Sequence, residues 1–334
     1  MDQYFVYILL ICLWNLSSAY YIKRHLPTPP VAKYRFNTLF VQQDELDQID
    51  TDIEAWTPED GTNVWEHSGL FEGDIMLYTK QPIKNGIIDE AYRWPDATIP
   101  YYIDDAFTDE EVVSILNAMQ EYHDKTCVRF RPFVKTDEYW IDIKQDWSGC
   151  WSSVGMKRQG QIVNLGSEKC RQHGVIIHEL MHAAGFHHQQ SASDRDDYII
   201  IHWDNIKSGR EHNFNKYDDA VVSNFDVTYD YNSVMHYSAK AFSKNGNITI
   251  EPIYEYTVLG QRIGLSEGDI QKINTMYNSS CNNNALSTIE LHLQMQQQQQ
   301  QEVTPTPVGQ HFLETVIKWF ESIFGLSLWS KRHI

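Results

Sequence analysis

The stretch from His178 to His188 reads HELMHAAGFHH and contains the pattern HExxHxxGxxH. Residues four apart lie on one face of a helix, so His178 and His182 can bind the same metal ion. Gly185 can adopt the positive φ that ends a helix, and the resulting turn lets His188 approach that ion. Three neutral nitrogen ligands with an open fourth position are typical of a catalytic zinc site. Glu179 follows the first ligand and can reach a water molecule there.

A helix that is rich in histidine by accident is the alternative to a zinc site. The extended pattern arises by chance on the order of once in millions of positions. The apolar runs Val175-Ile176-Ile177 and Leu180-Met181 are those expected of a buried helix. The sequence therefore predicts a helix over about 168–184 that carries a zinc site with one Zn²⁺ per chain.

Two further segments resemble the astacin family of zinc metalloendopeptidases. Ser233-Val234-Met235-His236-Tyr237 is similar to the family's Met-turn, and residues 149–155, GCWSSVG, are similar to its GCWSxVG segment. The similarity runs from about Trp94 to Cys281. It implies an α+β metzincin fold of two halves, with an upper sheet and active-site helix, a lower irregular half, and the zinc cleft between them.

The resemblance also implies a mechanism of peptide-bond hydrolysis. Met235 would form an apolar floor under the zinc, and Tyr237 would be a switchable zinc ligand that moves to stabilise the transition state. Glu179 would act as general base and then as general acid. A secreted binding protein that keeps the fold without catalysis is the alternative, but such proteins typically lose the general base. Another metzincin subtype is a second alternative, against which Tyr237 argues.

Two residues depart from the family pattern. Gln189 and Ala192 stand where the family usually has Glu and Arg. In the family that Glu pairs with the new N-terminal ammonium after the propeptide is removed. Because charge-assisted hydrogen bonds are roughly twice as strong as neutral ones, we expect weaker N-terminal anchoring here.

The cysteines favour an oxidising compartment. Cys12 lies in an apolar N-terminal run, and the other four are even in number, which is typical of a secreted disulfide framework. Four cysteines allow three connectivities. The resemblance selects Cys127–Cys281 and Cys150–Cys170. Free thiols in a cytosolic enzyme are the alternative.

Residues 1–19 predict a signal peptide for secretion. The apolar run from Phe5 to Leu16 is followed by the small residues Ser17-Ser18-Ala19. A short membrane anchor is the alternative, because the leading segment lacks the usual positive charge, although the run is short for a transmembrane span. In a secreted chain Asn247 and Asn278 are candidate glycosylation sites.

Residues 20–84 are expected to form a propeptide; they are polar and acidic in the middle, from Asp44 to Glu54, and show no clear periodicity. Within them Phe71-Glu72-Gly73-Asp74 resembles the family's FxGD element. There the aspartate, here Asp74, binds zinc at its open position and displaces the catalytic water. A plain turn is the alternative, since Gly-Asp is prone to turns.

The catalytic domain is expected to span residues 85–281. The family's mature chain begins nine residues before the position of Trp94, which places the cut between Lys84 and Asn85. Cleavage after lysine predicts a trypsin-like activating protease. Residues 282–334 carry a glutamine run and then apolar residues at helical spacing. This tail could dock on the catalytic domain or a partner, lie on a membrane surface, or be poorly ordered.

Within the catalytic domain, local patterns predict several elements. Thr108 and Glu111 form a capping box, which begins a helix over 109–124. Alternation and apolar spacing predict the remaining elements, namely strands within 127–133, 139–143 and 161–165 and a last helix over 270–277.

Charge and one further resemblance bear on partners. The chain has 27 basic and 45 acidic residues, a formal net charge of −18, which argues against nucleic acid as a partner. We expect a monomer without a transmembrane span that acts on proteins or peptides. Gly260-Gln261-Arg262 resembles a segment near the primed-side pocket of the family, where Arg262 would favour acidic residues after the scissile bond. An ordinary surface arginine is the alternative.

Overall fold

The structure is a computed structural model that describes residues 28–29, 43–77, 90–157, 159–218, 223–254, 257–279 and 281. The chain divides into two units, 1–281 and 282–334, and all described residues belong to the first. The predicted signal peptide, the Lys84–Asn85 cleavage site and the predicted tail lie outside the described residues. Within the described part, no helix is both long and apolar enough to cross a membrane.

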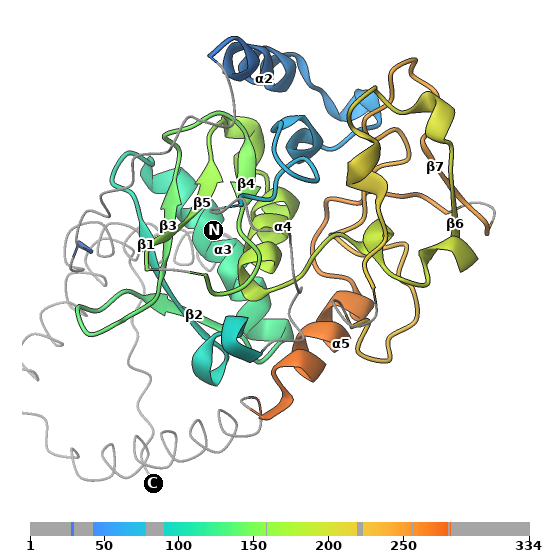
Figure 1. The fold of residues 1–334 in the computed structure, drawn as a ribbon. Coiled ribbons are helices and arrows are strands. Elements are labelled where there is room, and N and C mark those ends of the chain that lie inside the picture. The colour runs from blue at the N-terminus through green and yellow to red at the C-terminus, as the bar shows by residue number, and fades with distance from the viewer. Residues whose placement is uncertain are drawn as a thin grey trace, which may run out of the picture. The chain divides into compact units, whose positions relative to one another are not determined.

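A five-stranded sheet, in the order β2-β1-β3-β5-β4, forms the half of the domain that corresponds to the expected upper half, and it lies on the left in Figure 1. All neighbouring strands are parallel except β4, which runs antiparallel to β5. Every residue of β5 is buried, as expected for a parallel strand that is covered on both faces. The strands are β1 (Thr98–Ile103), β2 (Arg129–Pro132), β3 (Ile141–Lys144), β4 (Cys150–Ser152) and β5 (Gln161–Leu165).

Helix α3 (Asp109–Lys125) begins at the predicted capping box. The Thr108 hydroxyl accepts from the Glu111 amide at 3.3 Å, and the Glu111 carboxylate accepts from the Thr108 amide at 2.8 Å. One face of α3 is buried against the sheet and α4, and the Tyr122 hydroxyl donates to the Ile177 carbonyl at 2.8 Å. The predicted helix over 109–124 is therefore confirmed.

Helix α4 (His173–Ala184) starts later than the sequence predicts. A 3-10 turn over Glu168–Arg171 comes first, and Gln172 then adopts an extended backbone, with φ −68° and ψ 141°. The expectation of one continuous helix from about 168 is therefore wrong, because Gln172 breaks the helical backbone between the two elements. At the other end Gly185 has φ 126°, as its position in the motif predicts.

The lower half is largely irregular, in agreement with the expected α+β metzincin architecture. After His188 the chain forms short 3-10 turns and a two-stranded antiparallel sheet of β6 (Ile199–Ile201) and β7 (Ile250–Pro252). Helix α5 (Glu267–Met276) closes the domain and begins at a second capping box, on Ser266. The 3-10 turns of this half are Gln189–Ser191, Arg195–Asp197, Trp203–Asn205 and Glu211–Phe214.

The segment before residue 78 is folded onto the domain. Although its sequence shows no clear periodicity, residues Gln43–Ala55 form α2, whose buried Ile49 and Ile53 lie in the main apolar core. The 3-10 turns Pro58–Asp60 and Val64–His67 follow. The chain then runs beside β4, where the Ser152 amide donates to the Asp74 carbonyl at 3.0 Å.

Two disulfides join distant parts of the domain, and they are the pairs that the resemblance implies. Cys127 and Cys281 have Cα atoms 5.1 Å apart and are separated by 154 residues; Cys150 and Cys170 have Cα atoms 5.4 Å apart. In the chain-entropy account, a bridge that closes so long a loop stabilises the fold by about 5 kcal/mol. The second bridge fixes the 3-10 turn before α4 to strand β4.

Candidate metal centre

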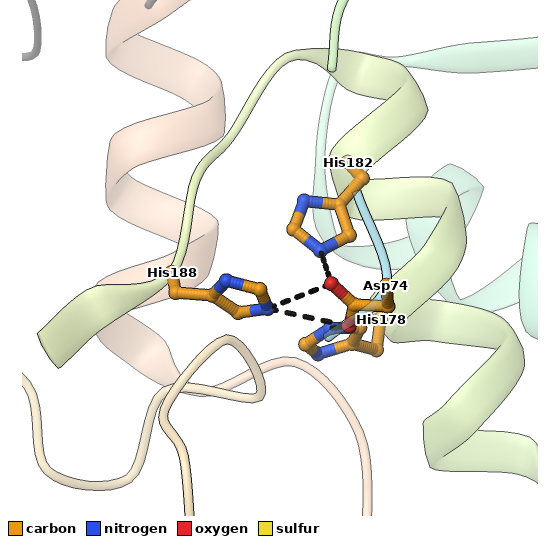
Figure 2. Close-up of side chains that lie close together, drawn as sticks. All are labelled: Asp74, His178, His182 and His188. Carbon is orange, nitrogen blue, oxygen red and sulfur yellow. Dashed lines mark hydrogen bonds and ion pairs between the residues drawn. The ribbon is translucent and has the colours of Figure 1, made fainter. Parts of the chain in front are cut away.

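Four side chains from three parts of the chain meet at one buried point. Figure 2 shows His178 and His182 on α4, His188 on the segment after it, and Asp74 facing all three rings. The potential ligand atoms all lie within 4.8 Å of one another. Asp74 Oδ2 is 2.9 Å from His178 Nε2, and Asp74 Oδ1 lies 3.4 Å from His182 Nε2 and 3.2 Å from His188 Nε2.

The other nitrogen of each ring has a hydrogen-bond partner of its own. His178 Nδ1 lies 2.8 Å from the carbonyl oxygen of Val234, and His182 Nδ1 lies 2.7 Å from that of Phe186. A carbonyl oxygen can only accept, so Nδ1 carries the proton in both rings and Nε2 of the neutral ring presents its lone pair to the centre. This arrangement is common for histidines that bind a metal.

The electrostatics of the cluster fit a bound cation. Burial lowers the pKa of His178 to about 4, so this ring is neutral at pH 7. Burial alone would raise the pKa of Asp74, but the charges of His188 and His182 hold it well below its usual value. An ionised carboxylate and the lone pair of a neutral imidazole therefore face each other at 2.9 Å. A divalent cation relieves this opposition, and histidine nitrogen with carboxylate oxygen is a ligand set that suits zinc.

Glu179 lies on α4 directly after the first histidine and is fully buried. Neither of its carboxylate oxygens has a hydrogen-bond partner among the described residues. Burial, and then the charge of Asp74, raise its pKa well above the usual value. A buried, unpaired carboxyl group with a raised pKa beside a metal cluster is a strong candidate for proton transfer.

Tyr237 is buried next to the cluster, and Met235 is buried in the main apolar core. The Tyr237 ring lies 4.7 Å from that of His188 between centroids, and its hydroxyl donates to the carbonyl of Glu72 at 2.6 Å. Burial, and then the charges of Glu72 and Asp74, raise the pKa of Tyr237 well above its usual value, so the phenol is neutral and can donate. The Met235 carbonyl accepts from the Gln189 amide at 3.0 Å, which joins the Met-turn to the segment of the third histidine.

Sequence reasoning missed the residue that holds the Met-turn in place. The buried carboxylate of Asp269, on α5, accepts from the Ser233 hydroxyl at 2.6 Å and from the Val234 amide at 2.9 Å. Val234 in turn supplies the carbonyl that orients His178. The local signal in the sequence was the capping box of Ser266 and Asp269, which predicts the start of α5 but not the contact with the Met-turn.

Gln189, which replaces the usual glutamate of the family, has a partner within the domain. The ammonium of Lys272, a buried residue of α5, donates to its side-chain oxygen. Burial lowers the pKa of Lys272. No local pattern indicates this contact, because the two residues lie 83 positions apart.

Arg262, Asn247 and Asn278 are not among the four residues of the cluster. Arg262 Nη1 donates to the Thr62 carbonyl at 2.8 Å and to Asn63 Oδ1 at 2.6 Å, so it is bound to the segment before residue 78. Its role in substrate preference stays a prediction. Asn247 and Asn278 are both exposed, as glycosylation would require.

Comparison with known proteins agrees with this geometry. Residues 86–278 match the family model described as Astacin, a peptidase family. The chain is 45% identical over 234 residues to meprin A subunit beta of Homo sapiens. The match covers 69% of this chain and 33% of the relative. It is 44% identical over 209 residues to zinc metalloproteinase nas-13 of Caenorhabditis elegans, and this match covers 62% of this chain and 46% of the relative. The chain thus spans between a third and a half of these relatives.

A solved structure with the same fold is high choriolytic enzyme 1, a hatching enzyme zinc-protease from Oryzias latipes (medaka fish). It is 38% identical to this chain with a TM-score of 0.53, and the match covers 57% of this chain and 96% of the enzyme. The family model covers more than half of the chain, and the histidine cluster lies within the matched residues. The chain therefore belongs to the astacin family of peptidases.

Proposed function

We propose that this chain is a secreted zinc metalloendopeptidase that is made in a latent form. The proposed domains are a signal peptide (1–19), a propeptide (20–84), the catalytic domain (85–281) and a C-terminal tail (282–334). The observation that carries the proposal is the buried cluster of three histidines and Asp74 beside the unpaired carboxyl group of Glu179. The names of the relatives, zinc metalloproteinase and hatching enzyme zinc-protease, support the same activity.

In this proposal, His178, His182 and His188 hold zinc, which when bound lowers the pKa of water and polarises the scissile carbonyl. Glu179 takes the proton of the attacking water and delivers it to the leaving nitrogen. Tyr237, neutral because its pKa is raised, donates its hydroxyl to the developing oxyanion.

Latency follows from what the propeptide covers. Asp74 faces all three histidines and would take the ligand position that catalysis needs. The ring of Trp65 stacks on that of His178 at 4.1 Å between centroids. Residues 74–76 exchange backbone hydrogen bonds with Ser152 on β4, the edge strand of the sheet, which would otherwise be free to pair with an extended substrate. These contacts support a propeptide that excludes substrate until it is cut.

Cleavage between Lys84 and Asn85 by a trypsin-like protease would release this inhibition. The cut would separate Asp74 and Trp65 from the catalytic domain. Both disulfides lie within residues 85–281, so the catalytic domain would keep them after activation. We further propose extracellular action on protein or peptide substrates as a monomer.

The test is hydrolysis of casein by trypsin-treated chain, with the zinc content of each sample measured. The wild-type chain should be active, and Glu179→Gln should bind one zinc ion per chain yet lose activity by about 10²- to 10⁴-fold, as expected for loss of a general base. The exposed Glu110→Gln is the matched control and should be as active as the wild type. A wild-type chain that holds zinc without its propeptide and cleaves nothing would instead support the inactive binding protein.

A further inference from the structure

Glu72, two residues before Asp74, contacts the metal centre through a different ligand. Its side chain is buried, and its Oε2 accepts from His188 Nδ1 at 2.9 Å. Its other oxygen accepts from the hydroxyl of Tyr217. Its backbone amide donates to Asn213 Oδ1 at 3.1 Å. All three partners belong to the expected catalytic domain, so the Glu72 side chain joins the propeptide to the third histidine.

The three histidines differ in the permanence of their partners. His178 and His182 donate to backbone carbonyls of Val234 and Phe186, which stay in place when the propeptide leaves. Only His188, of the three, donates to a side chain, and that side chain belongs to Glu72 in the propeptide. A carboxylate on the far nitrogen of a histidine fixes its tautomer and raises its strength as a metal ligand. The latent chain therefore has an outer carboxylate that the cleaved chain lacks.

The backbone around Glu72 shows how firmly this contact is held. Glu72 has φ 48°, in the left-handed region. For a residue with a side chain this conformation costs roughly 1–2 kcal/mol, which glycine would avoid. The compensating contacts are the two hydrogen bonds of the carboxylate and the one that its carbonyl accepts from Tyr237 at 2.6 Å. The side chain of Glu72 is thus directed to His188 by a backbone that is held on both sides.

We propose that Glu72 is a positioning residue of the latent metal centre, whose carboxylate orients His188 and raises the affinity of the site for zinc until the propeptide is removed. This inference rests on the proposed function. Activation then weakens zinc binding in two ways, by loss of the Asp74 ligand and by loss of the partner of His188. The latent chain is accordingly the form that acquires and keeps the metal.

The test measures zinc affinity rather than activity. Full-length latent chain is titrated with zinc in competition with a chromophoric chelator, as wild type, Glu72→Ala and Glu72→Gln. Glu72→Ala should weaken zinc binding by about 10- to 100-fold, the usual effect of removing an outer partner of a ligand. The zinc affinity of Glu72→Gln should fall between those of the wild type and Glu72→Ala, because its amide oxygen can accept from His188 but carries no charge.

The matched control is Glu66→Ala. Glu66 is also a buried acid of the proposed propeptide, but it accepts from the Ser238 amide at 2.7 Å and the Ser238 hydroxyl at 2.8 Å, and among the described residues it forms no hydrogen bond with a histidine. This variant should loosen the propeptide with less than a threefold change in zinc affinity. Equal losses in Glu66→Ala and Glu72→Ala would overturn the inference, since both would then reflect docking alone.

Trypsin supplies an internal control for folding. After a cut at Lys84, wild type and Glu72→Ala have the same mature sequence, so their zinc affinities should become equal. A difference that persists after the cut would mean damaged folding and would contradict the inference. If the cleaved chain is an active, chelator-sensitive peptidase but latent Glu72→Ala binds zinc as the wild type does, the inference fails while the proposed function stands. If the cleaved wild type is inactive, the proposed function fails.

Discussion

At the scale of single residues, burial decides which groups around the centre carry charge. Burial lowers the pKa of His178 and raises that of Glu179, while nearby histidines keep Asp74 ionised. The result is one carboxylate that faces the metal ligands and one carboxyl group that is free for proton transfer. Their roles differ because Asp74 lies opposite three imidazole rings, whereas Glu179 has no hydrogen-bond donor among the described residues.

This difference predicts the behaviour of an Asp74→Ala chain. Without the carboxylate, the three histidines keep their other partners, but the fourth ligand position is open to water and substrate. The uncut variant should hydrolyse casein at least about tenfold faster than the uncut wild type, since the remaining propeptide contacts still compete with substrate. After trypsin treatment the two should be equally active. Equal activity of the uncut chains would show that Asp74 does not maintain latency.

A second prediction concerns Asp142, which lies on β3 and accepts from Trp140 Nε1 at 2.8 Å. Burial raises its pKa from 3.8 to about 6. Because the pKa is higher in the folded chain, protonated Asp142 stabilises the fold below about pH 4, and this stabilisation is lost as the pH rises through about 6. The shift corresponds to at most about 3 kcal/mol.

Asp142→Asn, which carries no charge at any pH, should therefore melt at a higher temperature than the wild type at pH 7.5. The difference should shrink to nothing near pH 4. Thermal unfolding of both chains across this range checks the sign. A difference that is constant with pH would contradict the account, because it could not come from the titration of Asp142.

At the scale of elements, the start of α3 depends on one side chain. Thr108→Ala removes the hydroxyl that accepts from the Glu111 amide. Loss of such a cap typically lowers the free energy of unfolding by about 0.5–2 kcal/mol, and urea unfolding should show a decrease in this range. Thr108→Ser keeps the hydroxyl, so its free energy of unfolding should fall by less than half as much as that of Thr108→Ala. Equal losses in the two variants would mean that the methyl group, not the cap, stabilises the helix.

Arg262, in the segment before α5, binds Thr62 and Asn63 in the segment before residue 78. Its substitution distinguishes a role in docking that segment from a role in substrate preference. Arg262→Ala removes the hydrogen bonds to Thr62 and Asn63, so the uncut chain should be cut by trypsin faster than the wild type. Arg129→Ala is the control, because the Arg129 side chain bonds to the carbonyls of Thr126 and Val128 within the catalytic domain. Unchanged cleavage of Arg262→Ala would rule out a docking role. If the cleaved variant no longer prefers acidic residues after the scissile bond, Arg262 also determines substrate preference.

The elements also show what a sequence can predict. The start of α3 follows from its capping box, and the end of α4 from Gly185, because each signal and its effect lie within one helical turn. The last helix was expected over 270–277 from apolar spacing, but α5 begins at Glu267, because the cap on Ser266 lies before the first apolar residue. The start of α4 could not be placed, because glutamine is not a residue type that forbids a helix and the extended backbone of Gln172 depends on surrounding contacts. Helix α2 was missed because, among those of its side chains whose burial the structure describes, only Ile49 and Ile53 are buried.

At the scale of the whole molecule, the site joins segments that are distant in sequence. The three histidines and Glu179 could be predicted because the motif places them within 11 consecutive residues. Glu72 could not, since its contact with His188 spans 116 positions. Such contacts exist only once the segment before residue 78 lies along β4. The fold therefore supports both parts of the proposal, a local metal-binding motif and a distant segment that would block it.

We propose that this chain holds zinc both before and after cleavage of the propeptide but cleaves peptides only after it. The most direct measurement compares casein hydrolysis by intact and trypsin-cleaved chain, each with its zinc content determined, before and after chelation. We expect zinc in both forms, activity in the cleaved form alone, loss of that activity on chelation and its return when zinc is added. Equal activity of the intact and cleaved chains, or full activity of the cleaved chain without metal, would contradict it.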